Sequence, residues 1–372
     1  MNFKDTLQSA ELVIETNEVP IIVGESGIGK TALAKELAKK RGWSLVVIDG
    51  NLLKEGEIGG LPTVEDYNFK DARGRIISKK STVYAIHTKL QEIDSLIRDG
   101  KEVFLFIDEI NRCEHTVQQE LMNLILNREI NGYKLHDKVK ILAAMNPSSK
   151  YGDDVDYQVV DMDSAQENRF VWLDMESDSK AWLTWAIENN LEQNVIEFIS
   201  TFPEYLQSTL KDEQIRATPR SFERVSKTYK IYKKDKNKTP KRIILNIIKG
   251  NLGDRIAHEF MAFAEENNEP LISYEEVFAH SELSQNLISK VKKESHTRLY
   301  LIAKNILHIL NKKEAIDIDI ERFIDFLKIY PVDLGIGIMQ DIKESYNSVY
   351  KLCLENEAFV EMYFKAYNEI KG

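Results

Sequence analysis

Cysteine, glycine and proline are scarce in this chain of 372 residues, and their scarcity excludes several classes of protein. Cys113 and Cys353 are the only cysteines, and neither has a second Cys or a His at metal-ligand spacing. A disulfide framework and a structural zinc site are therefore not expected, and a reducing compartment fits. With 17 Gly, 8 Pro and 43% hydrophobic residues, the chain is neither collagen-like nor of low complexity nor wholly disordered. We expect a globular protein with a large core.

Long apolar runs and an excess of positive charge are also missing. No eighteen apolar residues follow one another, and the first fifteen residues include Asp5 and Glu11. We therefore expect neither a membrane span nor a signal peptide, and we expect a cytoplasmic protein. The formal net charge of -10 argues against indiscriminate binding to phosphate backbones, although a local basic patch could still contact nucleic acid.

The first half of the chain alternates short apolar runs with amphipathic helical stretches. The runs, rich in β-branched residues, cover residues 19–24, 43–50, 103–109, 139–147 and 169–175. Such alternation predicts β-α-β units, which form an α/β fold with a parallel sheet covered by helices on both faces. Beyond residue 176 the runs vanish and helical periodicity takes over, so a helical domain follows.

The first apolar run leads into a sequence that fits the phosphate-binding pattern G-x-x-x-x-G-K-[S/T] and opens a helix. Its residues are Gly24, Glu25, Ser26, Gly27, Ile28, Gly29, Lys30 and Thr31. Glycines let the backbone curl so that its N–H groups face a β-phosphate, and the helix N-terminus adds positive potential. Lys30 would reach the β and γ oxygens, and Thr31 would ligate Mg²⁺. The pattern predicts a nucleotide site.

An acidic pair supplies the second half of that site. The apolar run VFLFI ends in Asp108 and Glu109. Acidic residues just after a buried strand lie at the carboxyl edge of the sheet, where open α/β folds bind ligands. Asp108 is predicted to hold Mg²⁺, and Glu109 to orient and deprotonate the attacking water. The phosphate-binding loop does not identify the nucleobase. The chain contains no Asn-Lys-x-Asp sequence, the motif that recognises guanine, so we expect ATP as the nucleotide.

With these motifs the chain resembles the AAA+ ATPases, and more narrowly their MoxR-like and dynein-related branch, in which DEINR at 108–112 is the form of the Walker B motif. The resemblance implies a sensor 1 role for Asn146, an arginine-finger role for Arg169 and a sensor 2 role for Arg220. It also implies a P-loop core over 1–176, a helical lid over 177–265 and a helical C-terminal extension over 266–372.

Each of these three assignments has a simpler alternative. Asn146 follows an apolar run and could cap the next turn. Arg169 could pair with Asp163 or Glu167. Arg220 follows Pro219, which favours the first turn of a helix, and could be an ordinary surface side chain. Cys113, next to DEINR, is interpreted as a packing residue.

Two hairpins are expected within the core. Lys30 and Asp108 are 78 positions apart (108 minus 30), which is long for one strand and two helices. The segment 57–90, with a Gly-Gly-Leu-Pro break and turn residues near Gly74, therefore predicts a hairpin insert, as the resemblance implies for helix 2. A second hairpin is predicted at 127–140 around Asn131-Gly132, a strong two-residue turn signal. The resemblance places both where a substrate or partner is gripped; ordinary surface hairpins remain the alternative.

The resemblance implies a ring, expected to be a hexamer, that uses ATP and Mg²⁺ to remodel a partner protein, with von Willebrand factor A domain proteins as the first class to test. The alternative is a nucleic-acid-directed motor or restriction-type subunit. Two features support this alternative. The insert contains the basic residues Arg73, Arg75, Lys79 and Lys80, and the segment 233–242 is rich in lysine. We expect the segment 233–242 to be a solvated loop between helices. A scaffold without turnover is disfavoured because Glu109 and Arg169 are both present.

Overall fold

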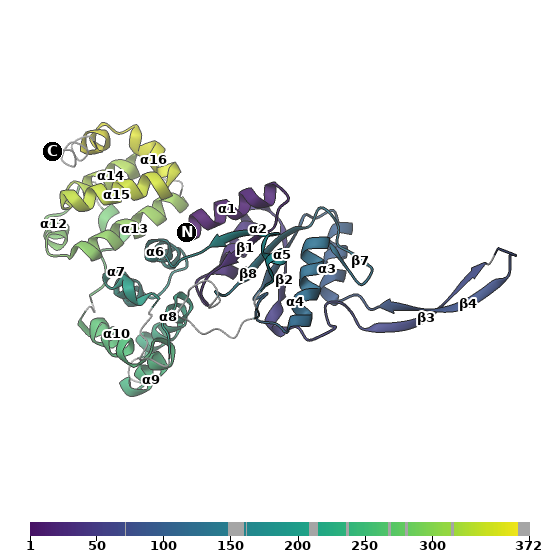
Figure 1. The fold of residues 1–372 in the computed structure, drawn as a ribbon. Helices are drawn as coiled ribbons and strands as arrows, with labels where there is room; N and C mark the ends of the chain where they lie inside the picture. The colour runs from purple at the N-terminus through teal and green to yellow at the C-terminus, as the bar shows by residue number, and fades with distance from the viewer. Residues whose placement is uncertain are drawn as a thin grey trace. The chain divides into compact units, whose positions relative to one another are not determined.

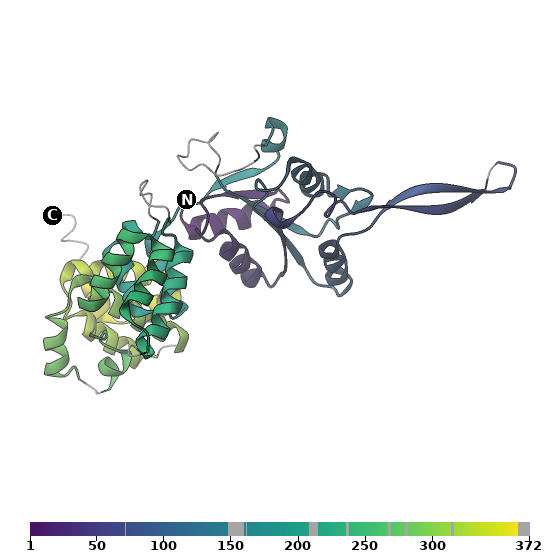
Figure 2. The same cartoon turned by 90° about the horizontal axis from the view of Figure 1, so that it is seen from below.

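The computed structural model describes residues 1–70, 72–147, 160, 162–207, 215–235, 238–266, 269–279, 282–313 and 316–363. The chain divides into two compact units, residues 1–178 and 179–372 (Figures 1 and 2). No helix in the described part of the chain is both long enough and apolar enough to cross a membrane.

The first unit is built on a five-stranded parallel sheet, as the alternating pattern predicted. In spatial order the strands are β2 (Ser44–Asp49), β5 (Val103–Asp108), β8 (Lys140–Met145), β1 (Pro20–Val23) and β9 (Val171–Asp174). Each strand falls within one of the five apolar runs. Because β1 lies between β8 and β9 while the chain next crosses to the far edge at β2, the connections diverge beside β1, which is where such sheets bind ligands.

Helices cover both faces of this sheet and bury alternate residues of its strands (Figure 1). Helices α1 (Phe3–Glu15) and α2 (Lys30–Arg41) share one core with Ile22 and with Phe104 and Phe106. Helices α3 (Thr88–Arg98) and α4 (His115–Met122) share the other core with Ile21 and Val23. Strand side chains alternate in direction, so covering both faces requires continuously apolar strands.

The insert between β2 and α3 is a long antiparallel hairpin. Strand β3 (Pro62–Lys70) pairs with β4 (Ile76–Tyr84) from Pro62 opposite Tyr84 to Lys70 opposite Ile76. Nearly all of its described side chains are exposed. Both views show the hairpin extending away from the sheet of its own unit (Figures 1 and 2).

The second predicted hairpin is also present. Strands β6 (Glu129–Ile130) and β7 (Tyr133–Lys134) are joined by Asn131 and Gly132, whose φ angles are 43° and 86°. Positive φ at both central residues is the signature of the tight turn that matches strand twist. The hairpin follows α4 through a π-helical turn, η2 (Asn123–Asn127).

The base of the long hairpin is fastened to the rest of the unit at Gly59. Its N–H donates to Glu120 Oε2 of α4 at 3.3 Å, and its carbonyl accepts from Asn131 Nδ2 at 2.9 Å. Burial raises the pKa of Glu120, although the bond from the Gly59 N–H opposes the rise. Next to it, Gly60 has a φ of 82°, and a Cβ there would lie 1.9 Å from the carbonyl oxygen of Ala85. The strands therefore meet at a point where only glycine fits.

Substituting Gly60 should destabilise the unit more than the same change at the hairpin tip. Gly74 has a similar φ of 77° but open space around it. Gly74→Ala should cost about 1–2 kcal/mol, the usual penalty of the left-handed conformation, whereas Gly60→Ala should cost about 2 kcal/mol more because backbone must also move. Urea unfolding of the two variants measures the difference, and equal losses would show that Ala85 does not confine Gly60.

Every regular element among the described residues of the second unit is a helix, which confirms the predicted change of pattern. Its helices are α6 (Ser179–Glu188), α7 (Gln193–Thr201), η4 (Pro203–Tyr205), α8 (Pro219–Lys234), α9 (Lys241–Leu252), α10 (Asp254–Glu266), α11 (Tyr274–Phe278), α12 (Gln285–Val291), α13 (His296–Lys313), α14 (Asp317–Leu327), α15 (Val332–Ser345) and α16 (Asn347–Leu354). The Lys-rich segment 233–242 begins in α8 and ends in α9, and residues 236 and 237 lie outside the described part.

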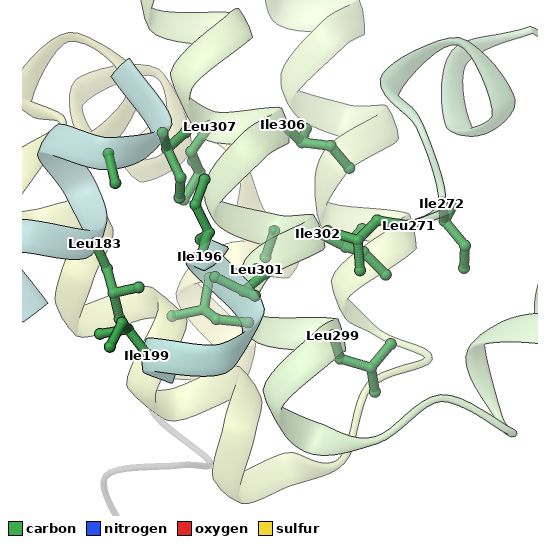
Figure 3. Close-up of a cluster of buried hydrophobic side chains, with 14 of the residues drawn as sticks. Leu183, Ile196, Ile199, Leu271, Ile272, Leu299, Leu301, Ile302, Ile306 and Leu307 are labelled. Atoms are coloured by element: carbon green, nitrogen blue, oxygen red, sulfur yellow. The ribbon is translucent and has the colours of Figure 1, made fainter. Parts of the chain in front are cut away.

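One hydrophobic core runs through this helical unit, from Trp182 to Phe359. Figure 3 shows Leu183, Ile196 and Ile199 with buried leucines and isoleucines of α13. An ion pair also crosses the core: Arg298 Nη1 of α13 lies 2.8 Å from Glu197 Oε2 of α7, whose side chain is 1% exposed. The division of this unit into a lid and an extension at residue 265 stays a prediction.

Candidate nucleotide site

The glycine-rich loop leaves β1 and enters α2 through two left-handed residues. Gly27 and Gly29 have φ angles of 82° and 117°, and Gly29 is the N-cap of α2. At the start of the loop, a Cβ on Gly24 would lie 2.9 Å from the carbonyl oxygen of Met175. Gly27 and Gly29 are thus needed for the left-handed backbone conformation, and Gly24 is needed for the close approach to Met175. Because Gly29 has no side chain to cap the helix, the first N–H groups of α2 are available to an anion.

Lys30 is buried within this loop, with a relative exposure of 6%. Its Nζ donates to Asn146 Oδ1 at 2.9 Å, to the carbonyl of Glu25 at 3.0 Å and to the carbonyl of Gly24. A buried ammonium group needs such oxygen partners. The predicted P-loop lysine and the predicted sensor residue, 116 positions apart, are therefore in direct contact.

Thr31 and Asp108 also meet, as the sequence predicted. Thr31 Oγ1 donates to Asp108 Oδ2 at 2.7 Å. A hydroxyl and a carboxylate are the hard oxygen donors that Mg²⁺ takes when phosphates complete its shell. Among the described residues no group of three or more His, Cys, Asp or Glu side chains could hold a metal ion.

Glu109 follows Asp108 in an unusual backbone conformation. Its φ is 51°, in the left-handed region that costs most residues free energy. Its carboxylate lies 3.3 Å from Arg112 Nη1, and both side chains are partly exposed. A pair so accessible to water contributes little free energy. The contact with Arg112 therefore holds the Glu109 carboxylate only weakly, and the carboxylate can leave it at little cost in free energy.

Asp49 is an acidic residue of the site that the sequence reasoning missed. It ends β2 directly opposite Asp108 in the register of β2 and β5. Burial raises the pKa of Asp49, and the negative charges of Glu109 and Asp108 raise it further. The signal was available, because VVID at 46–49 ends in an acid just as LFID does at 105–108.

Asn111 is the second residue that sequence reasoning missed. It is 1% exposed, and its side-chain amide bonds to both main-chain groups of Asn146: Nδ2 donates to the carbonyl at 2.8 Å, and Oδ1 accepts from the N–H at 3.2 Å. Asn146 itself is fully buried, and its Nδ2 has no hydrogen-bond partner among the described residues. No sequence pattern announces this pairing across 35 positions.

The two predicted arginines are both exposed, and only Arg169 belongs to the same unit as this cluster. Arg169 is exposed in the turn between α5 (Ser164–Glu167) and β9, and it forms no ion pair with any described residue, Asp163 and Glu167 included. Arg220 is exposed in the first turn of α8, which Thr218 caps, as the preceding proline suggested. It belongs to the helical unit.

Cys113 is buried beside the acidic segment and does not have the properties of a nucleophile. Its Sγ donates to the carbonyl of Ile110 at 3.1 Å, and burial raises the pKa of the thiol to about 11. The thiolate is the reactive form, and it is negligible at neutral pH. These observations support the interpretation of Cys113 as a packing residue.

Comparison with protein families agrees with this geometry. Residues 20–162 match the family described as AAA domain (dynein-related subfamily). This part of the chain, residues 20–162, is therefore similar to the AAA domains of the dynein-related subfamily. The match spans the sheet from β1 to β8, the hairpin insert, the P-loop and the acidic pair. With these motifs in place, the AAA domain makes the chain an ATP hydrolase of the P-loop class.

Solved structures with a similar fold include the RuvB Holliday junction branch migration motor of Thermotoga maritima, at 16% identity and a TM-score of 0.36 over 82% of this chain and 86% of that one. NtrX from Brucella abortus, in complex with ADP, is 10% identical with a TM-score of 0.39 over 91% and 67%. At these values the similarities define neither substrate nor partner. No curated protein sequence matches the chain significantly.

Two substitutions should separate nucleotide binding from hydrolysis. Lys30→Ala should abolish ATP binding, because Lys30 is predicted to contact ground-state phosphates. Glu109→Gln should bind ATP normally and hydrolyse it slowly, because Glu109 is predicted to act on water in the transition state. Titration with a fluorescent ATP analogue and steady-state ATPase assays measure both. Equal loss of binding in the two variants would contradict the division of roles.

Proposed function

We propose that the protein is a ring-forming AAA+ ATPase that couples ATP binding and hydrolysis to the remodelling of a partner protein. The observation that carries the proposal is the anchored β3–β4 hairpin. Gly59 at its base bonds to Glu120, and Glu120 belongs to α4, the helix that follows the acidic pair. A displacement at Asp108 and Glu109 on hydrolysis would reach the hairpin through one helix.

The surface of the hairpin suits a protein partner. Large apolar side chains are exposed along the hairpin: Leu61 just before β3, Val64 in β3 and Ile76 in β4 are each 67–68% exposed. Tyr67 and Phe69 share a face, with ring centroids 6.2 Å apart. Exposed apolar and aromatic side chains on a surface element mark interaction sites. In this proposal a partner protein binds there, and a von Willebrand factor A domain protein is the first candidate.

The nucleotide chemistry follows from the residues already placed. Lys30 and the N–H groups of the loop bind the β- and γ-phosphates, while Glu109 accepts a proton from the attacking water and Asn146 orients that water. Thr31 and Asp108 would hold Mg²⁺, which supplies charge neutralisation between the phosphates. Arg220 would sense the γ-phosphate from the lid. Arg169, exposed and without an ion-pair partner among the described residues, would complete the site of the neighbouring subunit.

Activity should then be a property of the ring. Arg169→Ala subunits should bind ATP yet fail to hydrolyse it, and Lys30→Ala subunits should fail at binding. In mixed rings, an intact P-loop of the first variant meets an intact Arg169 of the second, so part of the activity should return. ATPase rates across mixing ratios measure the recovery. An absence of recovery in rings shown to be mixed would contradict the finger role and favour Arg112, despite its contact with Glu109.

Partner binding should depend on ATP and on the hairpin. In a Glu109→Gln background, which retains ATP, a purified von Willebrand factor A domain protein should co-elute with the ring. The changes Tyr67→Ser and Phe69→Ser together should weaken that association at least tenfold by removing apolar contact area. Ile231→Ser, which removes an apolar side chain 73% exposed on α8, is the matched control and should have no effect.

Equal binding by the hairpin variant and the control would show that the partner docks elsewhere. The alternative function, a nucleic-acid-directed motor or restriction-type subunit, rests on the basic residues of the same hairpin. Lys79 Nζ lies 4.6 Å from the centroid of the Phe69 ring, a combination of charge and aromatic face that also suits nucleic acid. Salt-dependent binding of DNA or RNA that is lost with Lys79→Ala would favour it.

A further inference from the structure

Strand β8 extends further along the sheet than its neighbour β5, because the chain leaves the sheet at the end of β5. Pairing of β5 with β8 reaches Ile107 opposite Ala143, and the N–H of Ile110 still donates to the carbonyl of Ala144 at 3.1 Å. Between these points Glu109 takes its left-handed conformation and redirects the chain toward α4. Asn146, beyond the end of β8, therefore has no strand residue beside it on that side.

The side chain of Asn111 stands in for that missing strand. A carboxamide has one carbonyl acceptor and an N–H donor, the same pair of groups as a peptide unit. By donating to the carbonyl of Asn146 and accepting from its N–H, Asn111 makes the two bonds that a neighbouring strand would make. Asn111 is itself fixed, because its own carbonyl accepts from the N–H of Val160 at 2.8 Å.

With its main chain held in this way, the side-chain amide of Asn146 also has a defined orientation. Oδ1 accepts from Lys30 Nζ, so the orientation of the amide is determined and Nδ2 is the donor left over. Buried donors without partners are rare in folded proteins, and each calls for an explanation. A donor reserved for the phosphate or for the attacking water is such an explanation.

We propose that Asn111 is a positioning residue for ATP hydrolysis, acting through the main chain of Asn146 without touching the nucleotide. The proposal rests on the role in water placement given to Asn146 under the proposed function. Displacement of a group in a reactive arrangement by about 1 Å can cost on the order of 100-fold in rate. Asn111 therefore controls kcat, and binding of ATP is left to the P-loop.

A double-mutant cycle tests this role in the full chain. Asn111→Ala should lower kcat on the order of 10- to 100-fold with little change in KM. The double variant Asn111→Ala with Asn146→Ala should have the kcat of Asn146→Ala alone, because both changes remove the same function. Asn111→Ser, which retains one hydroxyl, should lie between Asn111→Ala and the parent and serves if Asn111→Ala does not fold.

Gln118→Ala is the matched control. Gln118 is buried on α4, and its Nε2 donates to the carbonyl of Val160 at 3.0 Å, so its loss disturbs the same surroundings without reaching Asn146. It should keep the parental kcat, and binding of a fluorescent ADP analogue should be unchanged in Asn111→Ala and Gln118→Ala.

Three outcomes overturn the proposal. The first is a kcat within about twofold of the parent for Asn111→Ala. The second is a double variant whose kcat falls by the product of the two single effects, since Asn111 would then act independently of Asn146. The third is an equal loss of kcat in Gln118→Ala, which would show that any disturbance of the packing around Val160 slows hydrolysis. Failure of the proposed function itself is distinguishable, because Asn146→Ala alone would then hydrolyse ATP normally.

Discussion

The first unit depends on the burial of one ammonium group. Lys30 lies beneath the glycine loop, where a charged group is tolerated only if oxygen atoms surround it. Those oxygens come from the loop itself and from Asn146 at the end of β8. Strand order meets this requirement, because β1 and β8 are neighbours and end at the same edge of the sheet. The fold thus brings two distant segments to one lysine.

Local signals in the sequence were sufficient for the elements and for the phosphate loop. Fully apolar runs specify strands buried on both faces, and Gly24 to Thr31 specify the loop because the conformation and the chemistry are both written in consecutive residues. The Asn131-Gly132 turn is equally local. The strands, the conformation of the glycine loop and the turn were confirmed because no distant residue decides them, while phosphate binding by the loop stays a prediction.

Residues that act across the sequence could not be predicted in the same way. Asn111 and Asn146 are 35 positions apart, and Gly59 and Glu120 are 61 apart, so each pairing exists only once the sheet has assembled. The suggested pairing of Arg169 with Asp163 or Glu167 was wrong for a related reason, because Asp163 instead accepts from the N–H of Gln166 to cap α5. A nearby opposite charge does not establish an ion pair when a helix end competes for it.

The ion pair between Glu197 and Arg298 has a consequence for how the helical unit can be divided. Burial raises the pKa of Glu197, and Arg298 is the charge that opposes the rise. A fragment ending near residue 265 would lose Arg298 and, with the rest of α13, the helix that packs against the apolar residues of α7 beside Glu197. Apolar surface that the whole chain buries would then face water, which is unfavourable. The far helices thus supply both the counter-ion of Glu197 and part of the cover over α7, so a boundary at residue 265 would cut through a shared core.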